Sequence, residues 1–259
     1  MAAKSSAKSR PSARAKRGTT LTLEGVPFPL PGVSPRERAR AVSLLDALTR
    51  TYPDAHCELN YTAPHELLIA TILSAQSTDV GVNKATPALF AKFPTPADYA
   101  AATPAEIEPF VRSLGFFRNK AKAVHLAMKA VVERFGGSVP RTMDDLLSLH
   151  GVARKTANVV LGNAFGVNDG VVVDTHVERL AVRMGLVERG TSVTMIERTL
   201  MALIPRERWC DISHLLIFHG RRACKARGAR CSEHPICAKY GISCENRGPT
   251  KRAGKKKPT

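Results

Sequence analysis

The ten residues from Leu149 to Asn158, LHGVARKTAN, predict two short helices joined by a glycine turn. The first helix is expected over residues 143–149, and Arg154 begins the second. The first N–H groups of that second helix lack intrahelical partners and, together with the helix dipole, favour an anion. A nucleic-acid phosphate fits such a site. Because backbone atoms would bind it, the contact positions a nucleic acid without selecting a sequence.

Lys155 lies in the first turn of the second predicted helix, and Asp174 follows 19 residues later. The helix dipole disfavours an ammonium ion at Lys155, and partial burial would add to this effect, so the residue is placed to act as a nucleophile. A phosphate-binding surface lysine is the simpler interpretation. Asp174 is also a good N-cap for a helix that begins at Thr175, and capping leaves one carboxylate oxygen available. Taken together, the pair suggests a lysine nucleophile assisted by a carboxylate.

Helix-start signals recur along the chain from residue 34 onwards. The sequence SPRE at 34–37 combines an N-cap hydroxyl, a proline at the first helical position and a glutamate three residues after the cap, and TPAE at 103–106 repeats this pattern. Residues 64–75 are apolar almost throughout and predict a buried helix. The one β-like run, at 170–173, is too short to build a sheet. The sequence therefore predicts an all-α protein of roughly ten helices.

Basic residues are concentrated at the two ends of the chain. The formal net charge is +17, and most of it comes from six basic residues in the first twenty positions and six more after residue 246. We expect residues 1–33 and 246–259 to be disordered basic tails, because their composition cannot bury enough apolar surface to fold. They would bind a polyanion or serve only to keep the protein in solution. A further basic group indicates a phosphate-facing surface: Arg221, Arg222, Lys225, Arg227 and Arg230.

Length and hydropathy limit the possible classes of protein. The 259 residues, 44% of them hydrophobic, suffice for one large core or two small ones. No apolar run reaches the roughly 18 residues of a membrane span, and the N-terminus lacks the apolar segment of a signal peptide. We therefore expect a soluble, cytoplasmic protein without a membrane partner.

Several ordered motifs together resemble the endonuclease III family, whose members are DNA glycosylases with an associated abasic-site lyase activity. The resemblance covers about residues 36–245. The motifs that carry it are ELN at 58–60, LSAQSTD at 73–79, VNKAT at 82–86, LHGVARKTANVVL at 149–161, VDTH at 173–176 and FHGR at 218–221. The LHGVARKTANVVL and VDTH segments match the helix-hairpin-helix and Gly/Pro-Asp signature of that family.

The resemblance implies two helical domains with a DNA-binding cleft between them. Residues 57–167 would form a helical barrel domain that ends in the helix-hairpin-helix. Residues 36–56 and 168–245 would form an iron–sulfur cluster domain. Lys155 and Asp174 would then come from different domains and meet at the cleft.

The resemblance also implies a reaction. Lys155 would attack the sugar C1′ of a damaged nucleotide and displace the base, while Asp174 would stabilise positive charge on the sugar and assist proton transfer. β-Elimination from the resulting Schiff base would cut the strand on the 3′ side. The implied protein is a monomeric, nucleoid-associated DNA N-glycosylase and AP lyase that removes oxidised pyrimidines from double-stranded DNA in base excision repair.

A base inside duplex DNA must be rotated out of the helix before it can react. By resemblance, Gln76 would fill the vacated space and Phe116 would act as an apolar wedge. From the residues alone, Gln76 is equally compatible with a solvated loop, and core packing is the simpler role for Phe116 and Phe117. The residues expected to contact DNA are Gln76, Phe116, Gly151, Ala153, Arg154 and His176.

Two positions in the hairpin depart from the family pattern. His150 stands where the family usually has proline, and Ala153 stands where it usually has glycine. Alanine is unfavourable if the backbone there adopts a positive φ. Phosphate binding by the hairpin therefore depends on the backbone conformation of Ala153.

Four of the six cysteines fall within 21 residues: Cys224, Cys231, Cys237 and Cys244. In a reducing compartment such a group indicates a metal site rather than disulfides, and four thiolates suit zinc or a [4Fe–4S] cluster. The family resemblance implies [4Fe–4S], but the spacing is C-x6-C-x5-C-x6-C instead of the usual C-x6-C-x2-C-x5-C. His234 occupies the position of the missing cysteine and is the alternative ligand. We expect the four cysteines to hold the cluster.

Two other functions compete with this interpretation. A mismatch adenine glycosylase of the same superfamily lacks the nucleophilic lysine, so Lys155 argues against it. A non-catalytic DNA-binding module with a metal-stabilised loop would tolerate replacement of Lys155 and Asp174.

Overall fold

The computed structural model describes residues 20–229, 231 and 233–244. This part of the chain contains α-helices, one 3-10 helix and no β-strand, which confirms the predicted all-α class. The elements are α1 (Pro35–Thr51), α2 (Pro64–Leu73), α3 (Asp79–Lys92), α4 (Pro96–Ala101), α5 (Pro104–Val111), α6 (Phe117–Phe135), α7 (Met143–Leu147), α8 (Arg154–Phe165), α9 (Thr175–Arg183), α10 (Val193–Leu203), η1 (Arg206–Arg208), α11 (Trp209–Arg222) and α12 (Pro235–Tyr240). None of the described helices is long and apolar enough to cross a membrane.

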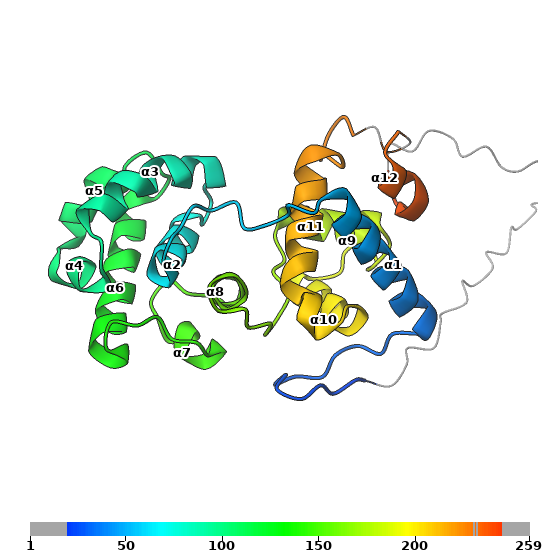
Figure 1. The fold of residues 1–259 in the computed structure, drawn as a ribbon, viewed down its shortest axis with the longest axis horizontal. Helices are drawn as coiled ribbons and strands as arrows, with labels where there is room; N and C mark the ends of the chain where they lie inside the picture. Colours follow the sequence, from blue (N-terminus) through cyan, green and yellow to red (C-terminus); the bar gives the residue numbers. More distant parts are fainter. Residues whose placement is uncertain (1–19, 230, 232, 245–259) are drawn as a thin grey trace, which may run out of the picture.

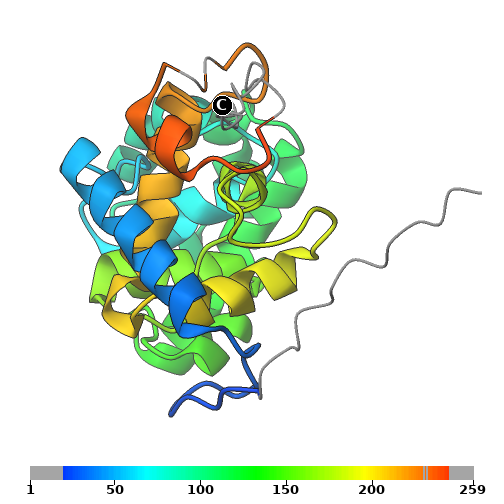
Figure 2. The same cartoon turned by 90° about the vertical axis from the view of Figure 1, so that its right-hand side faces the viewer.

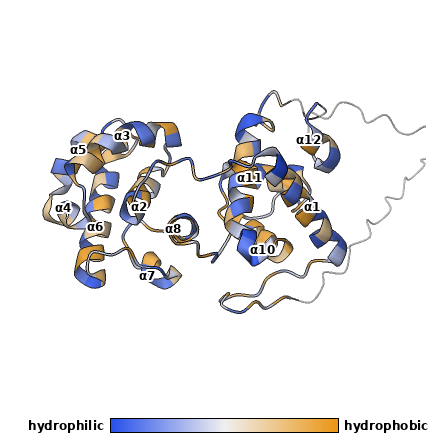
Figure 3. Ribbon diagram, in the orientation of Figure 1, coloured by the Kyte–Doolittle hydropathy of each residue, from blue (hydrophilic) through white to orange (hydrophobic). Residues whose placement is uncertain are grey.

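The helices pack around two separate hydrophobic cores (Figure 1). Helices α2–α8 form one lobe, which we call the helical lobe, around side chains such as Leu67 and Val124. Helices α1 and α9–α12 form the cysteine lobe around side chains such as Leu44 and Trp209. Apolar residues recur along the helices of both lobes (Figure 3). From residue 20 the chain runs through the cysteine lobe, crosses to the helical lobe after α1 and returns after α8.

The expected disordered tail is wrong for residues 20–33, which pack against the cysteine lobe before α1 (Figure 2). Leu21 and Leu30 form an isolated antiparallel bridge with N···O distances of 2.9 and 2.8 Å. Leu30 is fully buried, and Val26 is buried in the same core. The apolar side chains of this segment supply the burial that an ordered chain needs.

The remaining parts of both predicted tails, residues 1–19 and 246–259, lie outside the described residues, as does Arg230. The predicted β-like run at 170–173 contains no strand. Its three valines are buried beside α9 and α11 instead, and the N–H of Val172 donates to Ser213 Oγ at 3.0 Å. This connection fixes the start of α9, where Asp174 lies.

Helices α8 and α11 meet at a hydrogen bond between His214 Nε2 and Asn163 Oδ1, 2.7 Å long. Burial lowers the pKa of His214 from its usual 6.5 to about 4. The neutral ring therefore stabilises the fold above pH 6.5, and this contribution is lost as the pH falls from 6.5 towards 4. We expect the Tm to fall more steeply over that range in the wild type than in His214→Gln, measured by calorimetry at several pH values. Equal slopes would contradict a role for His214 in acid sensitivity.

Candidate active site and metal site

The predicted hairpin is formed by α7, α8 and the turn between them. Gly151 has a φ of 77°, and a Cβ added there would lie 3.1 Å from the Cβ of Ala123, so the turn favours glycine. Ala153 has φ −99° and ψ 168°, an extended conformation that alanine adopts without strain. The absence of glycine at this position therefore does not disturb the turn. No side-chain hydrogen bond caps α8, which leaves its first N–H groups for an anion.

Lys155 on α8 and Asp174 at the start of α9 line the same cleft between the two lobes. The cleft has a volume of about 850 Å³. A second cavity of about 110 Å³ shares both residues and extends between Val159 of α8 and Ile217 of α11. Lys155 is not partly buried, because its side chain is exposed to the cleft. The site therefore presents a solvent-accessible amine beside a carboxylate.

Asp174 is both the N-cap of α9 and a cleft residue. Its Oδ1 accepts hydrogen bonds from the N–H groups of His176 and Val177, both at 2.8 Å. Among the described residues no donor binds Oδ2, so this oxygen is available to a ligand in the cleft. The two roles considered for this residue are therefore compatible.

The substitution Asp174→Asn separates these two roles. Asparagine keeps an oxygen that caps α9 but removes the negative charge. We expect the Tm to change by no more than about 3 °C, since the cap is worth about 1 kcal/mol or less in this exchange. Strand cleavage at an abasic site should fall at least about 100-fold in single-turnover assays. Full activity would show that Asp174 is only a cap.

Three further charged residues line the cleft beside Lys155 and Asp174: Glu58, Asp79 and Arg221. No role in the cleft was predicted for them from the sequence. Arg221 on α11 donates to Glu58 and, at 2.6 Å, to Oδ2 of Asp79 at the start of α3. This ion-pair group connects the two lobes at the edge of the cleft. Burial raises the pKa of Asp79 and the carboxylate of Asp174 raises it further, while Lys155 opposes the rise. Asp79 is the last residue of the LSAQSTD motif and Arg221 the last residue of the FHGR motif, so both motifs could have pointed to this group.

The predicted phosphate-facing surface is wrong for Arg221, whose guanidinium is engaged with Glu58 and Asp79. Arg222 lies 3.7 Å from the centre of the Phe218 ring and also approaches Glu58 at 3.5 Å. Lys225 and Arg227 are exposed. Arg222 is exposed as well, so three described residues of this group face solvent, and of these Lys225 and Arg227 lie on the loop after α11.

Arg154 is a contact between the lobes as well as the first residue of α8. Its Nε donates to Glu197 Oε1 at 2.9 Å, and an NH2 group donates to the Asp169 carbonyl at 3.0 Å. The guanidinium also lies 4.9 Å from the centre of the Phe28 ring. The Arg154 side chain is therefore engaged within the protein, its backbone N–H remains for a phosphate, and contact of Arg154 with DNA stays a prediction. His176 lines the cleft, and its contact with DNA stays a prediction.

Gln76 and Phe116 lie in two turns of the helical lobe and are both exposed. The Phe116 side chain is 64% exposed, so core packing is wrong for this residue, whereas Phe117 packs against the core. Both backbones are left-handed, with φ of 53° at Gln76 and 58° at Phe116. No other non-glycine residue in the described ranges has a positive φ. Such conformations cost free energy and often occur where a side chain must be presented.

The four clustered cysteines converge at one buried site in the cysteine lobe. The Sγ atoms of Cys224, Cys231 and Cys244 lie within 4.8 Å of one another, and Cys237 approaches Cys224 equally closely. A hydrogen bond from Cys237 and the guanidinium of Arg183 lower the pKa of Cys224. Converging thiols with a stabilised thiolate suit a metal, which binds cysteine in its deprotonated form. The group can therefore bind metal.

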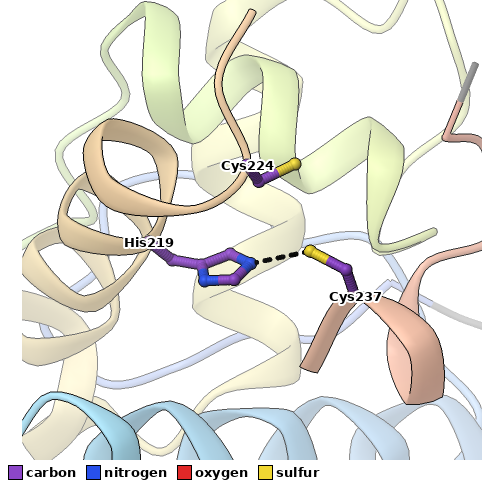
Figure 4. Close-up of side chains that lie close together, drawn as sticks. All are labelled: His219, Cys224 and Cys237. Atoms are coloured by element: carbon purple, nitrogen blue, oxygen red, sulfur yellow. Dashed lines mark hydrogen bonds between the residues drawn. The ribbon is translucent and has the colours of Figure 1, made fainter. Parts of the chain in front are cut away.

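Two residues that the spacing of the cysteines did not identify support this site. His219 lies on α11 and points at Cys237, which lies on α12 (Figure 4). The distance from His219 Nε2 to Cys237 Sγ is 3.1 Å. Arg183 is buried, lies 3.3 Å from Cys224 Sγ and donates to the carbonyl of Lys225 at 2.8 Å. These side chains hold the loop against α9 and α11.

His234, the alternative ligand, has a different position. Its Nδ1 accepts a hydrogen bond from the N–H of Ile236 at 3.3 Å and caps α12. The His234 ring packs against His219 with 4.8 Å between the ring centres. Among the described residues it is not in the convergent group, which contains His219 instead. The geometry therefore favours the cysteines over His234, and the full set of four cysteine ligands stays a prediction.

Comparisons with known proteins agree with this geometry. Residues 69–206 match the family described as HhH-GPD superfamily base excision DNA repair protein. Endonuclease III of Synechocystis sp. is 51% identical over 197 residues, which cover 76% of this chain and 90% of the relative. The chain belongs to the endonuclease III family. Endonuclease III of Bacillus subtilis is 44% identical over 210 residues, which cover 80% of this chain and 95% of the relative.

Solved structures of endonuclease III have the same fold. A non-covalent endonuclease III–DNA complex aligns with a TM-score of 0.74 and 45% identity, covering 78% of this chain and 94% of that protein. A trapped endonuclease III–DNA covalent intermediate aligns with a TM-score of 0.73 and 46% identity, covering 77% of this chain and 93% of that protein.

Proposed function

We propose that this endonuclease III family enzyme removes oxidised pyrimidines from double-stranded DNA and then cleaves the strand at the abasic site. It acts in base excision repair as a DNA glycosylase and AP lyase. The observation that carries the proposal is the position of Lys155 and Asp174, which come from different lobes and line one cleft. The related endonuclease III that was trapped as a covalent intermediate with DNA supports a nucleophile on the enzyme.

Lys155 begins the reaction in its neutral form. Its Nζ attacks the sugar C1′, and the bond from C1′ to the damaged base breaks. Asp174 Oδ2 stabilises the positive charge that develops on the sugar and exchanges protons with the lysine. Nζ loses a proton, and the C1′–O4′ bond then breaks with protonation of O4′, which opens the sugar ring and leaves a protonated Schiff base between Nζ and C1′. This Schiff base acidifies the C2′ proton, whose loss breaks the C3′–O bond and expels the 3′ phosphate. Water finally releases Lys155 from the cleaved strand.

DNA binding places the damaged nucleotide at this cleft. The exposed N–H groups at the start of α8 and the turn at Gly151 bind one phosphate of the damaged strand. Gln76 enters the space left by the rotated nucleotide, and Phe116 stacks beside it as a wedge. His176 contributes a further contact at the edge of the cleft.

Borohydride trapping tests this function on duplex DNA containing thymine glycol or an abasic site. The wild-type protein should form a covalent adduct with both substrates and none with undamaged duplex. Without borohydride, the product should carry a 3′ unsaturated aldehyde. If the base were released without any covalent adduct, the mechanism would be hydrolytic and would not involve a Schiff base. If the protein neither released the base nor cleaved the strand, the proposed activity would be wrong.

The cysteine site holds a [4Fe–4S] cluster through Cys224, Cys231, Cys237 and Cys244, by analogy with the family. Such a cluster would be structural and hold the loop with Lys225 and Arg227 against DNA. Iron and acid-labile sulfide in equal amounts, with visible absorbance, are the expected result. A colourless protein that contains zinc would contradict it.

The same proposal includes a monomeric protein located with the nucleoid. Its lobes supply both halves of the cleft from one chain, so no second subunit is required for the active site. Sedimentation of the free protein and of its complex with a lesion-containing duplex should give one protein per DNA molecule.

A further inference from the structure

One hydrogen bond joins the two turns that carry Gln76 and Phe116. The Nζ of Lys120 on α6 donates to Ser77 Oγ at 2.6 Å. Ser77 directly follows Gln76, while the N–H of Lys120 donates to the carbonyl of Phe116 at 3.0 Å. Two turns that are about forty residues apart in sequence are thereby connected through one residue, Lys120, by its side chain on one side and its backbone N–H on the other.

Lys120 is an unusual residue to find at this position. Only 5% of its surface is exposed, and burial lowers its pKa. Lysine is rarely buried unless it is paired, because an ammonium group loses hydration. Among the described residues, the one recorded partner of its Nζ is the neutral hydroxyl of Ser77. A buried methionine or leucine would serve packing alone at lower cost.

The two connected turns share a further property. Gln76 and Phe116 are the two non-glycine residues with left-handed backbones in the described ranges. A strained turn relaxes unless its surroundings hold it, and relaxation would move the exposed side chain. The bond from Lys120 to Ser77 restrains both turns at once. It therefore fixes the spacing of the two side chains.

We propose that Lys120 and Ser77 are positioning residues that hold Gln76 and Phe116 as one DNA-probing unit. This inference rests on the proposed function, in which those two side chains enter the duplex. The unit acts before the chemical step, when the paired nucleotide is rotated out. Its loss should therefore impair reaction with a paired lesion and spare reaction with a lesion that is already unpaired.

The test compares two DNA substrates with an abasic site, one fully paired and one in a short unpaired bubble. Lys120→Met and Ser77→Ala should each lower the single-turnover rate of trapping on paired DNA about tenfold, as expected for misplaced groups. The rate on bubble DNA should stay within about twofold of wild type, since the nucleophile is untouched. The double variant should be no slower than Lys120→Met, because both substitutions remove the same bond. Ser77→Thr, which keeps the hydroxyl, should restore the rate on paired DNA.

Two further measurements separate positioning from folding and from the activity itself. The Tm of Lys120→Met should equal or exceed that of wild type, because a buried ammonium is removed. A 2-aminopurine opposite the lesion should brighten when saturating wild-type protein opens the duplex, and this increase should shrink in Lys120→Met. Equal rate losses on both DNAs, additive losses in the double variant or unchanged fluorescence would overturn the inference. If the wild-type protein formed no covalent adduct with either DNA but still increased the 2-aminopurine fluorescence, the proposed lyase activity would be wrong. The positioning role of Lys120 and Ser77 would still stand in that case.

Discussion

Lys155→Gln should abolish borohydride trapping and lower strand cleavage at an abasic site by at least about 1,000-fold, the scale of losing a covalent nucleophile. Glutamine has no amine that can form a Schiff base. The side chain of Lys155 is exposed in the cleft, so the substitution should leave the fold intact. The affinity of the variant for lesion-containing duplex should stay within about tenfold of the wild-type affinity, because the substitution removes only one of many contacts with phosphates and sugars. Single-turnover cleavage and fluorescence anisotropy measure the two effects separately.

Lys122→Gln is the matched control, because Lys122 is an exposed lysine of α6 outside the cleft-lining residues. It should trap and cleave like wild type. The non-catalytic DNA-binding module makes the opposite prediction for Lys155. If Lys155→Gln retained both trapping and cleavage, another amine would have to be the nucleophile.

Cys237→Ala should remove the bound metal and lower the Tm of the cysteine lobe by at least about 10 °C, since structural metal sites contribute several kcal/mol to folding. The four thiols are buried, and α12 is attached to the lobe at Cys237 next to His219. Loss of the ligand should also release the loop that carries Lys225 and Arg227. DNA affinity should therefore fall about tenfold or more at moderate salt.

Cys57→Ala serves as the control, because Cys57 lies in the connection between α1 and α2, away from the convergent group. It should keep the metal content of wild type. Elemental analysis, calorimetry and anisotropy give the three readouts. Unchanged metal content in Cys237→Ala would exclude this cysteine as a ligand and reopen the question of which side chain completes the set.

The hairpin and the caps could be predicted because their signals are local. A turn needs Gly151 where φ is positive, and Asp174 caps the helix that directly follows it. The partners of charged side chains could not be predicted in this way. Glu197 lies 43 residues from Arg154, and Glu58 lies 163 residues from Arg221. Local patterns do not encode such pairings between distant residues, so neither ion pair was predicted.

The order of residues 20–33 was missed for a related reason. Composition groups this segment with the basic residues before it, but Leu30 reaches a core built mainly from α1 and from helices more than 140 residues later in the chain. Burial against distant residues outweighs local composition. The same limit applies to His219, whose role depends on Cys237 on a different helix.

The sequence by itself determined the helical class, the hairpin, the cysteine group and the family, since short-range periodicity, turn chemistry and ordered motifs carry that information. Only the tertiary structure decided which charges are available. It assigned Arg154 and Arg221 to contacts between the lobes, placed Asp79 beside Asp174, and buried Lys120 against Ser77. The physical reason is that a charged side chain is defined by its neighbours and its exposure, and folding sets both.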